Sequence, residues 1–420
     1  MNIIDELEWR NAINQQTDEE GLRELVNEKK ISLYCGVDPT GDSMHIGHLI
    51  PFMMMKRFQL EGHHPVILIG GATGTIGDPS GRQTERQLQT LGQVQHNVEA
   101  LTAQMKKLFD FGGNSKVKMV NNYDWTHEVS ILEFLRDYGK NFSVNTMLAK
   151  DIVASRLESG ISFTEFSYQI LQAMDFHHLY KHEDVQLQIG GSDQWGNITS
   201  GLDLIRKKEG SDAKVFGLTI PLLLKADGTK FGKTAGGAIW LDPEKTTPFE
   251  FYQFWVNTDD RDVVKYLKFF TFLTKDRIDE LAVKVQTEPH KREAQKVLAE
   301  EMTKFVHSEN AFLQAVKITE ALFSGDIKAL TADEIEQGFK DMPTFHAAKE
   351  TKNIVEWLVD LGIEPSRRQA REDINNGAIL MNGDKVTDVN TDVTVENSFD
   401  GRFIIIRKGK KSYSLVKLGK

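Results

Sequence analysis

The sequence predicts an α/β fold in which a parallel-sheet domain is followed by an α-helical domain and a small α+β domain. Three observations lead to this prediction. Apolar runs that end in glycine-rich turns alternate with helical stretches in the first half of the 420-residue chain, as in parallel sheets with crossover helices. Helical periodicity without strong strand signals follows from about Pro248 to Phe323. Short β-like runs then occupy the end of the chain.

Four apolar runs should contribute strands to the parallel sheet. They read "KISLYCGVDPTG", "PVILIGGATG", "VQLQIGGSD" and "VFGLTIPLLLK". A helix from about Ile46 to Glu61 is expected after the first run, and "ISFTEFSYQILQAMDFHHLYKH" is expected to be helical before the third. Because parallel sheets bind ligands beyond the carboxyl ends of their strands, the glycine-rich turns should share one crevice.

The second half of the chain divides where the sequence pattern changes. The stretch "SGDIKALTADEIEQGFKDMPTFHAAKE" is acidic and broken by turn residues, which indicates a connecting segment with short helices. From Lys352 the chain continues with a helical stretch, then "EPSRRQAREDINNGAIL", the turn "NGDK" and β-like runs ending in "RFIIIRKGKKSYSLVKLGK". We therefore expect four segments, at residues 1–225, 226–325, 326–351 and 352–420.

Composition is that of a soluble globular protein. Apolar residues make up 40% and charged residues 27%, which argues against disorder. Cys35 is the single cysteine, so an internal disulfide and a thiolate-rich zinc site are excluded, and a reducing cytoplasm is expected. The acidic start "MNIIDELEWRN" does not read as a signal peptide, and no apolar run approaches the ~18 residues of a membrane span.

Charge is distributed unevenly along the chain. The formal net charge of −10 disfavours a surface that is basic all over. From Lys352 onward, however, 12 Lys and Arg stand against 10 Asp and Glu, and seven of these bases lie between Arg402 and Lys420, where there is no acid. A small basic module on an acidic body suits RNA docking, because phosphate contacts dominate nucleic-acid affinity. A solubilising tail explains the charge equally well.

The stretch "YCGVDPTGDSMHIGHLIPF" places a strand, a turn and two histidines around the start of a helix. A helix N-terminus presents unpaired N–H groups and a partial positive charge, which suits a phosphate. His45 could donate to phosphate oxygens, and Gly47 would let a flat ring or a phosphate approach the backbone. Taken alone, the pattern more often marks a capped helix with two surface histidines. A zinc site is favoured less, because no further ligand cluster is close.

A glycine-rich loop, "KADGTKFGKTAGG", carries Lys225, Lys230 and Lys233. It resembles a phosphate-binding P-loop ending in Lys233 and Thr234, but only three residues separate Gly228 from Gly232 where that motif needs four. The pattern also fits a mobile loop that closes over a charged leaving group. An exposed hairpin with solvated lysines fits it about as well.

Polar residues also gather on one helix face and at two strand ends. Tyr168, Gln172 and Asp175 fall on a single stripe of an otherwise apolar helix, where they would need polar partners if buried; a solvent-facing stripe has equal weight. The turns "GGATGTIGDPSGRQTER" and "QIGGSDQWGN" could seat a ribose, although neither has G-x-G-x-x-G in the proper place. They supply Asp78, Arg82, Arg86, Gln188, Gly191, Asp193 and Gln194.

In order along the chain, "HIGH" at residues 45–48 and "KFGKT" at residues 230–234 resemble the two signature motifs of class I aminoacyl-tRNA synthetases. The second departs from K-M-S-K-S at three of five positions, in a form that bacterial tyrosyl enzymes carry. The stretches "YCGVDPT", "GDPSGR", "FSYQILQAMDF" and "IGGSDQWGNI" resemble the bacterial tyrosyl-tRNA synthetase family, and "EPSRRQAREDINNGAILMNGDKV" resembles its S4-type RNA-binding module. The resemblance covers nearly the whole chain and implies a Rossmann-like catalytic domain.

The resemblance also implies the site residues. Tyr34 and Asp175 would bind the phenol hydroxyl of tyrosine, with Gln188 beside them, and Asp78, Tyr168 and Gln172 would bind its ammonium group. ATP would meet Cys35, Gly36, Asp38, Gly47, His48, Gly191, Asp193 and Gln194. The groups expected to act in catalysis around the phosphates are Thr40, His45, His48, Arg82, Arg86, Lys230, Lys233 and Thr234. Those expected to bind tRNA are Arg367, Arg368, Arg371, Arg407, Lys408, Lys410 and Lys411.

The implied reaction joins L-tyrosine to ATP, giving tyrosyl-adenylate and pyrophosphate, and then transfers the tyrosyl group to the 3′-terminal adenosine of tRNA(Tyr). Mg²⁺ would accompany the ATP phosphates, and no protein-bound zinc is expected. The implied enzyme is a cytoplasmic homodimer without a membrane anchor. Two alternatives are a synthetase-like RNA-binding protein that has lost catalysis, which the intact motifs disfavour, and the sister enzyme for tryptophan, which should lack the S4-like module.

Overall fold

The computed structural model describes residues 2–80, 84, 87–112, 117–158, 160–234, 237–340, 342–409 and 412–419. Of Ile152, Lys233 and Thr234 only the backbone is described. The chain forms two compact units, which are described separately. The first contains Met1–Lys245 and Asn257–Met302, and the second contains Thr246–Val256 and Thr303–Lys420.

A six-stranded sheet forms the centre of the first unit. Its strands lie in the order β1 (Gln15–Gln16), β6 (Phe216–Ile220), β5 (Val185–Gly191), β2 (Ser32–Val37), β3 (His64–Ile69) and β4 (Lys118–Asn121). All neighbours are parallel except β1, which runs antiparallel to β6. The predicted parallel sheet is therefore confirmed, and β1 and β4 extend it at its two edges.

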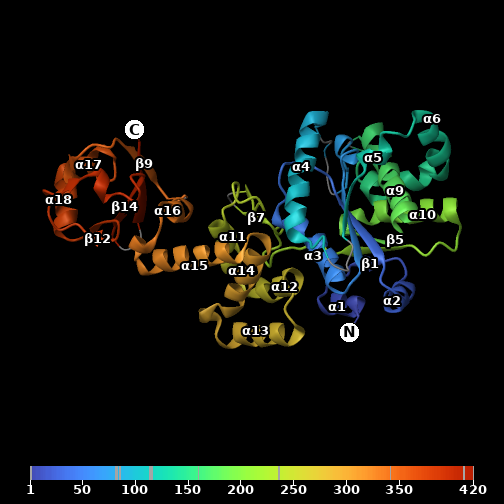
Figure 1. The fold of residues 1–420 in the computed structure, drawn as a ribbon, viewed down its shortest axis with the longest axis horizontal. Helices are drawn as coiled ribbons and strands as arrows, with labels where there is room; N and C mark the ends of the chain where they lie inside the picture. Colours follow the sequence, from blue (N-terminus) through green and yellow to red (C-terminus); the bar gives the residue numbers. More distant parts are fainter. Residues whose placement is uncertain are drawn as a thin grey trace. The chain divides into compact units, whose positions relative to one another are not determined.

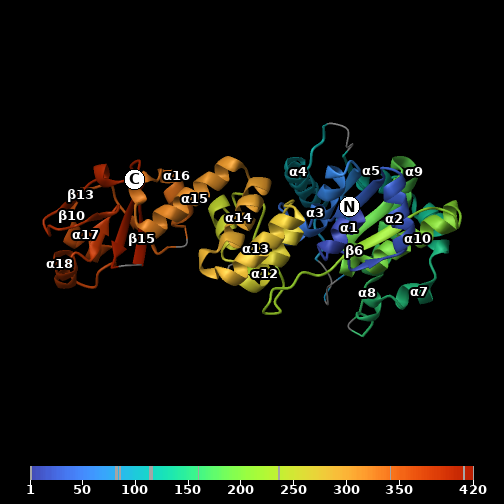
Figure 2. The same cartoon turned by 90° about the horizontal axis from the view of Figure 1, so that it is seen from below.

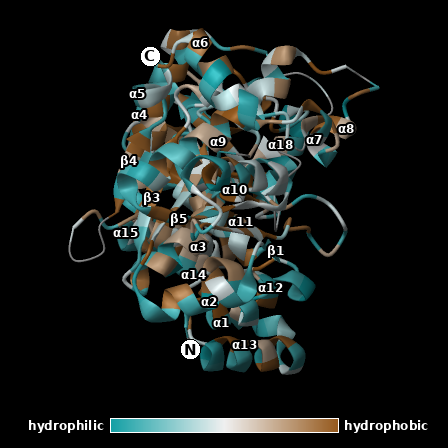
Figure 3. Cartoon of the chain, turned by 90° about the vertical axis from the view of Figure 1, so that its right-hand side faces the viewer, coloured by the Kyte–Doolittle hydropathy of each residue, from teal (hydrophilic) through white to brown (hydrophobic). Residues whose placement is uncertain are grey.

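Helices cover both faces of this sheet. Helices α3 (Ile46–Leu60) and α4 (Leu91–Leu108) lie on one side, and α9 (Phe163–Glu183) and α10 (Trp195–Glu209) lie on the other (Figure 1). The strands are almost entirely buried between them, as their apolar sequences require, and β3 and β5 carry much of the brown colour at the centre of Figure 3. The helix expected over residues 46–61 is confirmed to within one residue.

The other elements of the first unit are short helices and a small hairpin, followed by two longer helices. They are α1 (Ile3–Trp9), α2 (Glu19–Glu28), η1 (Thr73–Thr75), α5 (Tyr123–Thr126), α6 (Ile131–Glu133), η2 (Phe134–Tyr138), η3 (Gly139–Asn141), α7 (Val144–Leu148), α8 (Asp151–Ala154), η4 (Ser192–Gln194), β7 (Lys233–Thr234), β8 (Gly237–Ala238), α12 (Asp260–Phe270), α13 (Lys275–Thr287) and η5 (Pro289–Lys291). Helix α14 (Glu293–Val306) begins in this unit. Among the described residues, no helix has the length and apolar character needed to cross a membrane.

The strand order reverses at β2, and there the sheet opens. Strand β2 is paired with β3 along its whole length, but its pairing with β5 ends at Tyr34 and Gln188. Both strands continue, β2 through residues 35–37 and β5 through residues 189–191, without pairing with each other. Ligands of doubly wound sheets bind at such a switch point, so the polar groups around these strand ends form the candidate site.

Two buried arginines fix α12 against the N-terminal helices. Arg57 of α3 donates to the carbonyl oxygens of Lys268, Phe269 and Thr271 at 2.8–3.0 Å. Arg10, which follows α1, donates to the carbonyls of Lys268, Thr271 and Leu273. The guanidinium groups therefore replace the hydrogen bonds that the last carbonyls of a helix lack. Burial, and then the charge of Arg10, lower the pKa of Arg57 to about 9.

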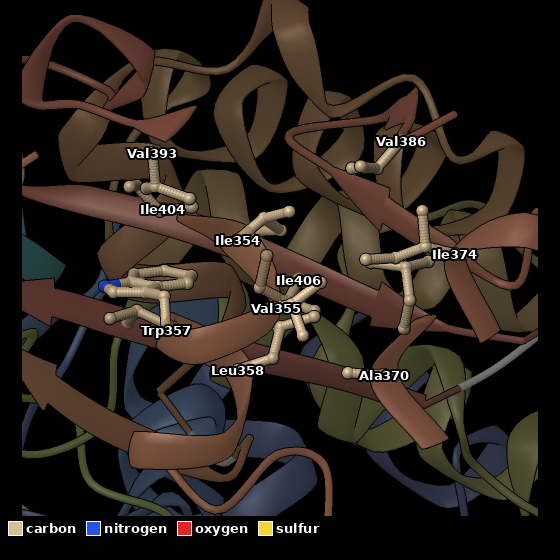
Figure 4. Packing of buried hydrophobic residues seen from close by; sticks show 12 residues of the cluster. Ile354, Val355, Trp357, Leu358, Ala370, Ile374, Val386, Val393, Ile404 and Ile406 are labelled. Atoms are coloured by element: carbon tan, nitrogen blue, oxygen red, sulfur yellow. The ribbon is translucent and has the colours of Figure 1, made fainter. Parts of the chain in front are cut away.

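The second unit is built on a five-stranded sheet with hydrophobic cores on both faces. Its strands lie in the order β12 (Asp384–Lys385), β11 (Ile379–Met381), β14 (Phe403–Lys408), β15 (Ser412–Leu418) and β9 (Thr344–Ala347). Ile404 and Ile406 pack under α17 (Ile354–Asp360) and α18 (Arg367–Asn375), as Figure 4 shows. The alternate residues Phe403 and Ile405 face α15 (Glu309–Ser324) and α16 (Ala332–Gly338).

Strand β9 shows how the expected connecting segment is used. Residues 344–347 pair in parallel with Leu415–Leu418 of β15, so this part of the segment lies inside the C-terminal sheet. Residues 326–351 also contain η6 (Ile327–Ala329) and α16, in line with the short helices expected there. Figure 2 shows β15 beside α16 and α15 and, farther along, the pair β10 (Lys352–Asn353) and β13 (Asp392–Val393). The remaining elements are α11 (Pro248–Val256) and η7 (Val395–Asn397).

We predict that Arg57→Met lowers the free energy of unfolding of the first unit by about 3 kcal/mol, because buried carbonyls lose a charged donor. Methionine keeps most of the apolar volume, so the loss reports mainly the hydrogen bonds. Urea unfolding, monitored by hydrogen exchange of the α12 amides, measures this change in the free energy of unfolding. Lys56→Met, at the adjacent and partly exposed position, is the control; equal losses in both variants would contradict the explanation.

Candidate active site

A cleft of about 480 Å³ opens where β2 and β5 separate. Its volume is in the range of small-ligand sites. Sixteen residues expected from the sequence to act in the site line it, and they come from regions far apart in the chain. They are Tyr34, Cys35, Gly36, Asp38, Thr40, Gly47, His48, Asp78, Tyr168, Gln172, Asp175, Gln188, Gly191, Asp193 and Gln194. The sixteenth is Lys230.

One end of the cleft is a buried group of polar atoms around Asp175. Asn122 donates to one oxygen of this carboxyl group and the indole N–H of Trp125 to the other, both at 2.9 Å. Among the described residues, the buried hydroxyl of Tyr34 has no hydrogen-bond partner, and neither does the side-chain oxygen of Gln188. Buried polar atoms are rarely left unpaired, so these two atoms are available to a polar ligand.

Burial is the main cause of the pKa shifts of Asp175 and Tyr34. It raises the pKa of Asp175 to about 7, against the two hydrogen bonds, which lower it; the charge of Asp38 raises it further. Burial, followed by the charge of Asp175, holds the pKa of Tyr34 well above its ordinary value. Tyr34 is therefore a neutral hydroxyl that can donate and accept, beside a carboxyl group that changes protonation near neutral pH.

The helix face that carries Tyr168, Gln172 and Asp175 is turned into the protein, so a solvent-facing stripe is excluded. Tyr168 and Asp175 are both buried. The Tyr168 hydroxyl donates to Asp38 at 2.9 Å, and Gln172 donates to Gln194 at 3.2 Å. Gln194 in turn donates to Asp78 at 2.7 Å. This network joins α9 to the ends of β2 and β5 and to the loop after β3.

The two histidines serve as caps at the start of α3. Nδ1 of His45 accepts the N–H of Gly47 at 3.1 Å, and Nδ1 of His48 accepts the N–H of His45 at 3.2 Å. Their rings stack with centroids 3.9 Å apart. Because both Nδ1 atoms accept, the neutral rings carry their proton on Nε2. The capped helix and the site are thus compatible: His48 caps the helix and lines the cleft, whereas His45 lies one turn back.

Two glycines are required by close approaches around the cleft. A Cβ atom on Gly47 would lie 2.9 Å from the His45 ring and displace the cap. A Cβ atom on Gly70 would lie 2.1 Å from an oxygen of Asp38. That carboxylate accepts from Thr73 at 2.7 Å as well as from Tyr168, so its position depends on the missing side chain.

The residues that follow the glycine-rich loop are hydrogen-bonded to the residues around the start of α3. The N–H of Ile46 donates to the carbonyl of Ile239, and the N–H of Leu241 donates to the carbonyl of Met44. Leu224 and Lys230 lie opposite each other in an exposed hairpin. Of the two, Lys230 lines the cleft. The side chains of Lys233 and Thr234, and all of Arg82 and Arg86, lie outside the described residues.

Sequence reasoning missed several residues of the polar network. Asn122 and Trp125 follow β4, Thr73 follows β3, and Asn197 lies in the first turn of α10, where it donates to Ser80 and to Gln172. The signal that could have found Asn122 is its place directly after a strand end, but β4 is too short and too polar to be recognised as a strand. The sequence around Trp125 gives no sign that its indole N–H belongs to a polar site.

The basic groups of the C-terminal unit meet acids from elsewhere in that unit. Lys408 pairs with Glu364 and Asp373, and Arg367 pairs with Glu356. Arg402 pairs with Asp333 and Glu336 of α16. Arg368 and Arg371 are exposed on α18, and Arg407 donates to the Tyr413 hydroxyl. Lys410 and Lys411 lie outside the described residues.

The part of the chain that the structure describes has no group of three or more His, Cys, Asp or Glu side chains arranged to hold a metal ion. That no zinc is bound to the protein stays a prediction.

Comparison with known proteins gives matches along the whole chain. Residues 26–324 match the family of tRNA synthetases class I (W and Y), and residues 334–416 match the tyrosine–tRNA ligase SYY-like C-terminal domain. The chain is 90% identical over 419 residues to tyrosine–tRNA ligase 2 of Bacillus cereus, covering 100% of both chains. It is 72% identical over 416 residues to the tyrosine–tRNA ligase of Listeria monocytogenes, covering 99% of each.

Solved structures with the same fold include a C-terminally truncated mitochondrial tyrosyl-tRNA synthetase of Aspergillus nidulans. It is 34% identical, with a TM-score of 0.70 over 77% of this chain and 94% of that chain. A tryptophanyl-tRNA synthetase of Encephalitozoon cuniculi bound to tryptophan is 16% identical, with a TM-score of 0.55 over 79% and 89% of the two chains. That second likeness shows the shared fold alone.

We predict that the ligand-free protein loses stability as Asp175 loses its proton. The pKa of about 7 exceeds the ordinary value of 3.8, so the folded state binds this proton more tightly than the unfolded state. The advantage is complete below about pH 4 and disappears as the pH rises to about 7. Between about pH 5 and pH 8 the free energy of unfolding should fall by on the order of 2 kcal/mol relative to Asp175→Asn, which does not titrate. Urea unfolding at both pH values measures this; an identical pH response in the two proteins would exclude it.

Proposed function

The chain belongs to the tyrosyl-tRNA synthetases of class I, and from this premise we propose how its residues divide the work. It is a tyrosine–tRNA ligase, which activates L-tyrosine with ATP and transfers the tyrosyl group to tRNA(Tyr). The catalytic work is proposed for residues 1–225 together with the lysine loop that follows. Residues 352–420 are proposed to dock tRNA, with a helical segment at 226–325 and a connecting segment at 326–351.

Tyr34 and Asp175 are proposed to recognise the phenol hydroxyl of tyrosine. The observation that supports this most strongly is the buried, unpartnered Tyr34 hydroxyl beside the Asp175 carboxyl group. A phenol hydroxyl can donate to Asp175 and accept from Tyr34 at the same time. An indole N–H can only donate, so tryptophan would leave Tyr34 unpaired. Phenylalanine would leave both groups unpaired, which is the basis for rejecting it.

The ammonium and carboxylate ends of tyrosine then extend toward β5 and the loop after β3. Asp78, Tyr168 and Gln172 are proposed to hold the ammonium group, and Gln188 is proposed to lie along the same pocket. The hydrogen bonds from Tyr168 to Asp38 and from Gln194 to Asp78 support this, since they fix acceptors on one side of the cleft. The oxygens of Tyr168 and Gln172 can accept from the ammonium group while the hydrogen bonds that these side chains donate to Asp38 and Gln194 stay in place.

ATP is proposed to occupy the other end of the cleft. Its adenine would lie near Gly47 and His48, its ribose near Cys35, Gly191 and Asp193, with Gly36, Asp38 and Gln194 beside the nucleotide. Burial raises the pKa of Cys35 to about 12, so its thiol would meet the ribose as a neutral group. The phosphates are proposed to lie among Thr40, His45, Arg82, Arg86, Lys230, Lys233 and Thr234.

The chemistry asked of these residues is positioning and charge stabilisation. The tyrosine carboxylate attacks the α-phosphorus of ATP, and pyrophosphate leaves; the tRNA adenosine then takes the tyrosyl group from the adenylate. Cationic side chains and N–H donors would stabilise the charge that develops on the phosphates, without a covalent enzyme intermediate. Mg²⁺ is proposed to arrive as part of the ATP complex. A non-catalytic RNA-binding protein would have no use for this pocket.

We also propose a cytoplasmic homodimer. Apolar side chains with large exposed fractions recur along residues 131–163, from α6 to the start of α9, and α6 lies at the edge of the unit in Figure 3. The set contains Ile131, Leu132, Leu135, Val144, Leu157 and Phe163. Isolated exposed apolar residues are normal, but a concentration of this kind is typical of an interface between chains.

For tRNA, the exposed arginines of α18 are the proposed primary contacts. Arg368 and Arg371 are exposed on one short helix. Arg367, Arg407 and Lys408 already have partners within the unit, so they would have to exchange them for phosphates. Lys410 and Lys411 complete the proposed set.

We predict that Asp175→Ala abolishes tyrosine activation, because it removes the phenol acceptor and the acceptor of the buried Trp125 indole N–H. Tyr34→Phe should retain activation but lose about tenfold or more in discrimination between tyrosine and phenylalanine. Pyrophosphate exchange with each amino acid measures both. Near-normal exchange by Asp175→Ala would overturn the pocket assignment, and exchange with tryptophan but not tyrosine would favour the sister enzyme.

Replacing Arg368 and Arg371 together by alanine should weaken tRNA binding and lower the slope of log affinity against log salt by about 1 for each phosphate that the variant no longer binds. Tyrosine-dependent pyrophosphate exchange should not change. Arg402→Ala is the matched control, since its guanidinium is already held by Asp333 and Glu336. An unaltered salt slope in the double variant would refute docking through α18.

A further inference from the structure

Helix α12 holds the hairpin that carries Lys230 through three separate contacts. The hairpin runs from Leu223 to Phe231, closed by hydrogen bonds from Phe231 N to Leu223 O and from Lys225 N to Thr229 O. Leu224 lies directly opposite Lys230. Whatever fixes the Leu224 strand therefore fixes the position from which the Lys230 side chain reaches the cleft.

Two of the contacts are polar. The carboxylate of Asp262, which is almost fully buried, accepts the backbone N–H of Ala226 at 2.8 Å. The ammonium group of Lys265 donates to the carbonyl of Leu224 at 2.6 Å and to the other oxygen of Asp262 at 2.8 Å. The pair thus binds one N–H and one C=O of the same strand, as a neighbouring strand would.

The third contact is aromatic. The ring of Phe231, next to Lys230 in the chain, packs against Tyr266 and Phe270 with centroids 4.9 and 5.0 Å away. Residues 262, 265, 266 and 270 follow the spacing of a single helix face. One face of α12 therefore contacts both strands of the hairpin.

The far end of α12 is fixed to the helix that begins with the histidines. Arg57, in the last turn of α3, binds the carbonyls at the C-terminus of α12. Helix α12 thus connects α3, whose first turn borders the nucleotide end of the cleft, to the hairpin that brings Lys230 to it. Helix α12 therefore supports both α3 and the Lys230 hairpin, the two elements that border the proposed phosphate site.

We propose that Asp262 and Lys265 are positioning residues for adenylate formation, acting by fixing the Lys230 hairpin to α12. This inference rests on the proposed contact of Lys230 with the ATP phosphates. Neither residue lines the cleft, so neither touches substrate. Loss of either should leave tyrosine binding intact and slow the step in which the phosphates are held, because a small displacement of a positioned group costs a large factor in rate.

The test compares Asp262→Ala, Asp262→Asn and Lys265→Met with wild type in single-turnover adenylate formation, tyrosine affinity and thermal unfolding. Asp262→Ala and Lys265→Met should slow adenylate formation about tenfold or more at saturating ATP and leave the tyrosine dissociation constant within about twofold. Asp262→Asn keeps an acceptor for Ala226 N–H and should recover most of the rate. Lys268→Met, on the same helix with its ammonium group over the Trp9 ring, is the control and should match wild type. If Asp262→Ala does not fold, the other two variants decide.

Lys230→Met separates failure of the inference from failure of its premise. A normal rate in Lys230→Met would overturn the loop assignment and the inference with it. A slow Lys230→Met beside normal Asp262→Ala and Lys265→Met would overturn the α12 inference alone. The double variant of Asp262→Ala and Lys230→Met should be little slower than Lys230→Met, because both changes remove the same interaction with the phosphates; additive effects would contradict action through the hairpin.

Discussion

Where pairing between β2 and β5 ends at Tyr34 and Gln188, backbone groups and side chains of two neighbouring strands become available to a ligand. The rest of the site depends on this opening. Helix α9 closes one side with Asp175 and Tyr168, and α3 starts at the other with its two histidines. The reversal of strand order supplies the opening, and so a parallel sheet that continued in one direction would have no place for it.

Much of this could be predicted from residues adjacent to strands and helix starts. The strand ends at Val37 and Gly191, the helix from Ile46 and the stripe on α9 all carry strong local patterns, and the parallel sheet was confirmed. The pattern on α9 could not distinguish a buried stripe from a solvent-facing one, because that depends on what packs against it. Asn122 and Trp125 escaped notice because their function comes from a tertiary contact with Asp175 rather than from local sequence.

The histidine pair shows why a local interpretation and a functional one need not compete. A helix cap uses the Nδ1 atom of each ring, and the opposite edge of the ring keeps its proton on Nε2. Folding thereby fixes the tautomer before any substrate arrives. Folding likewise orients Asp175 before substrate binds: two donors fix its carboxyl group, and burial raises its pKa. The donors at Asp175 come from outside the sequence motifs, whereas those at the histidines are backbone N–H groups of the motif itself.

The ion pairs of the C-terminal unit change what association with a polyanion involves. Arg402 and Lys408, which have no acidic neighbour within the last nineteen residues of the sequence, form ion pairs with the acids of α16 and with Glu364 and Asp373. A phosphate that binds Lys408 would displace a carboxylate from the lysine, in addition to losing its own condensed counterion. The carboxylates of the unit would thus compete with the phosphates for the same basic groups. The number of small ions released, as obtained from the salt dependence of binding, would then be smaller than the number of phosphates in contact.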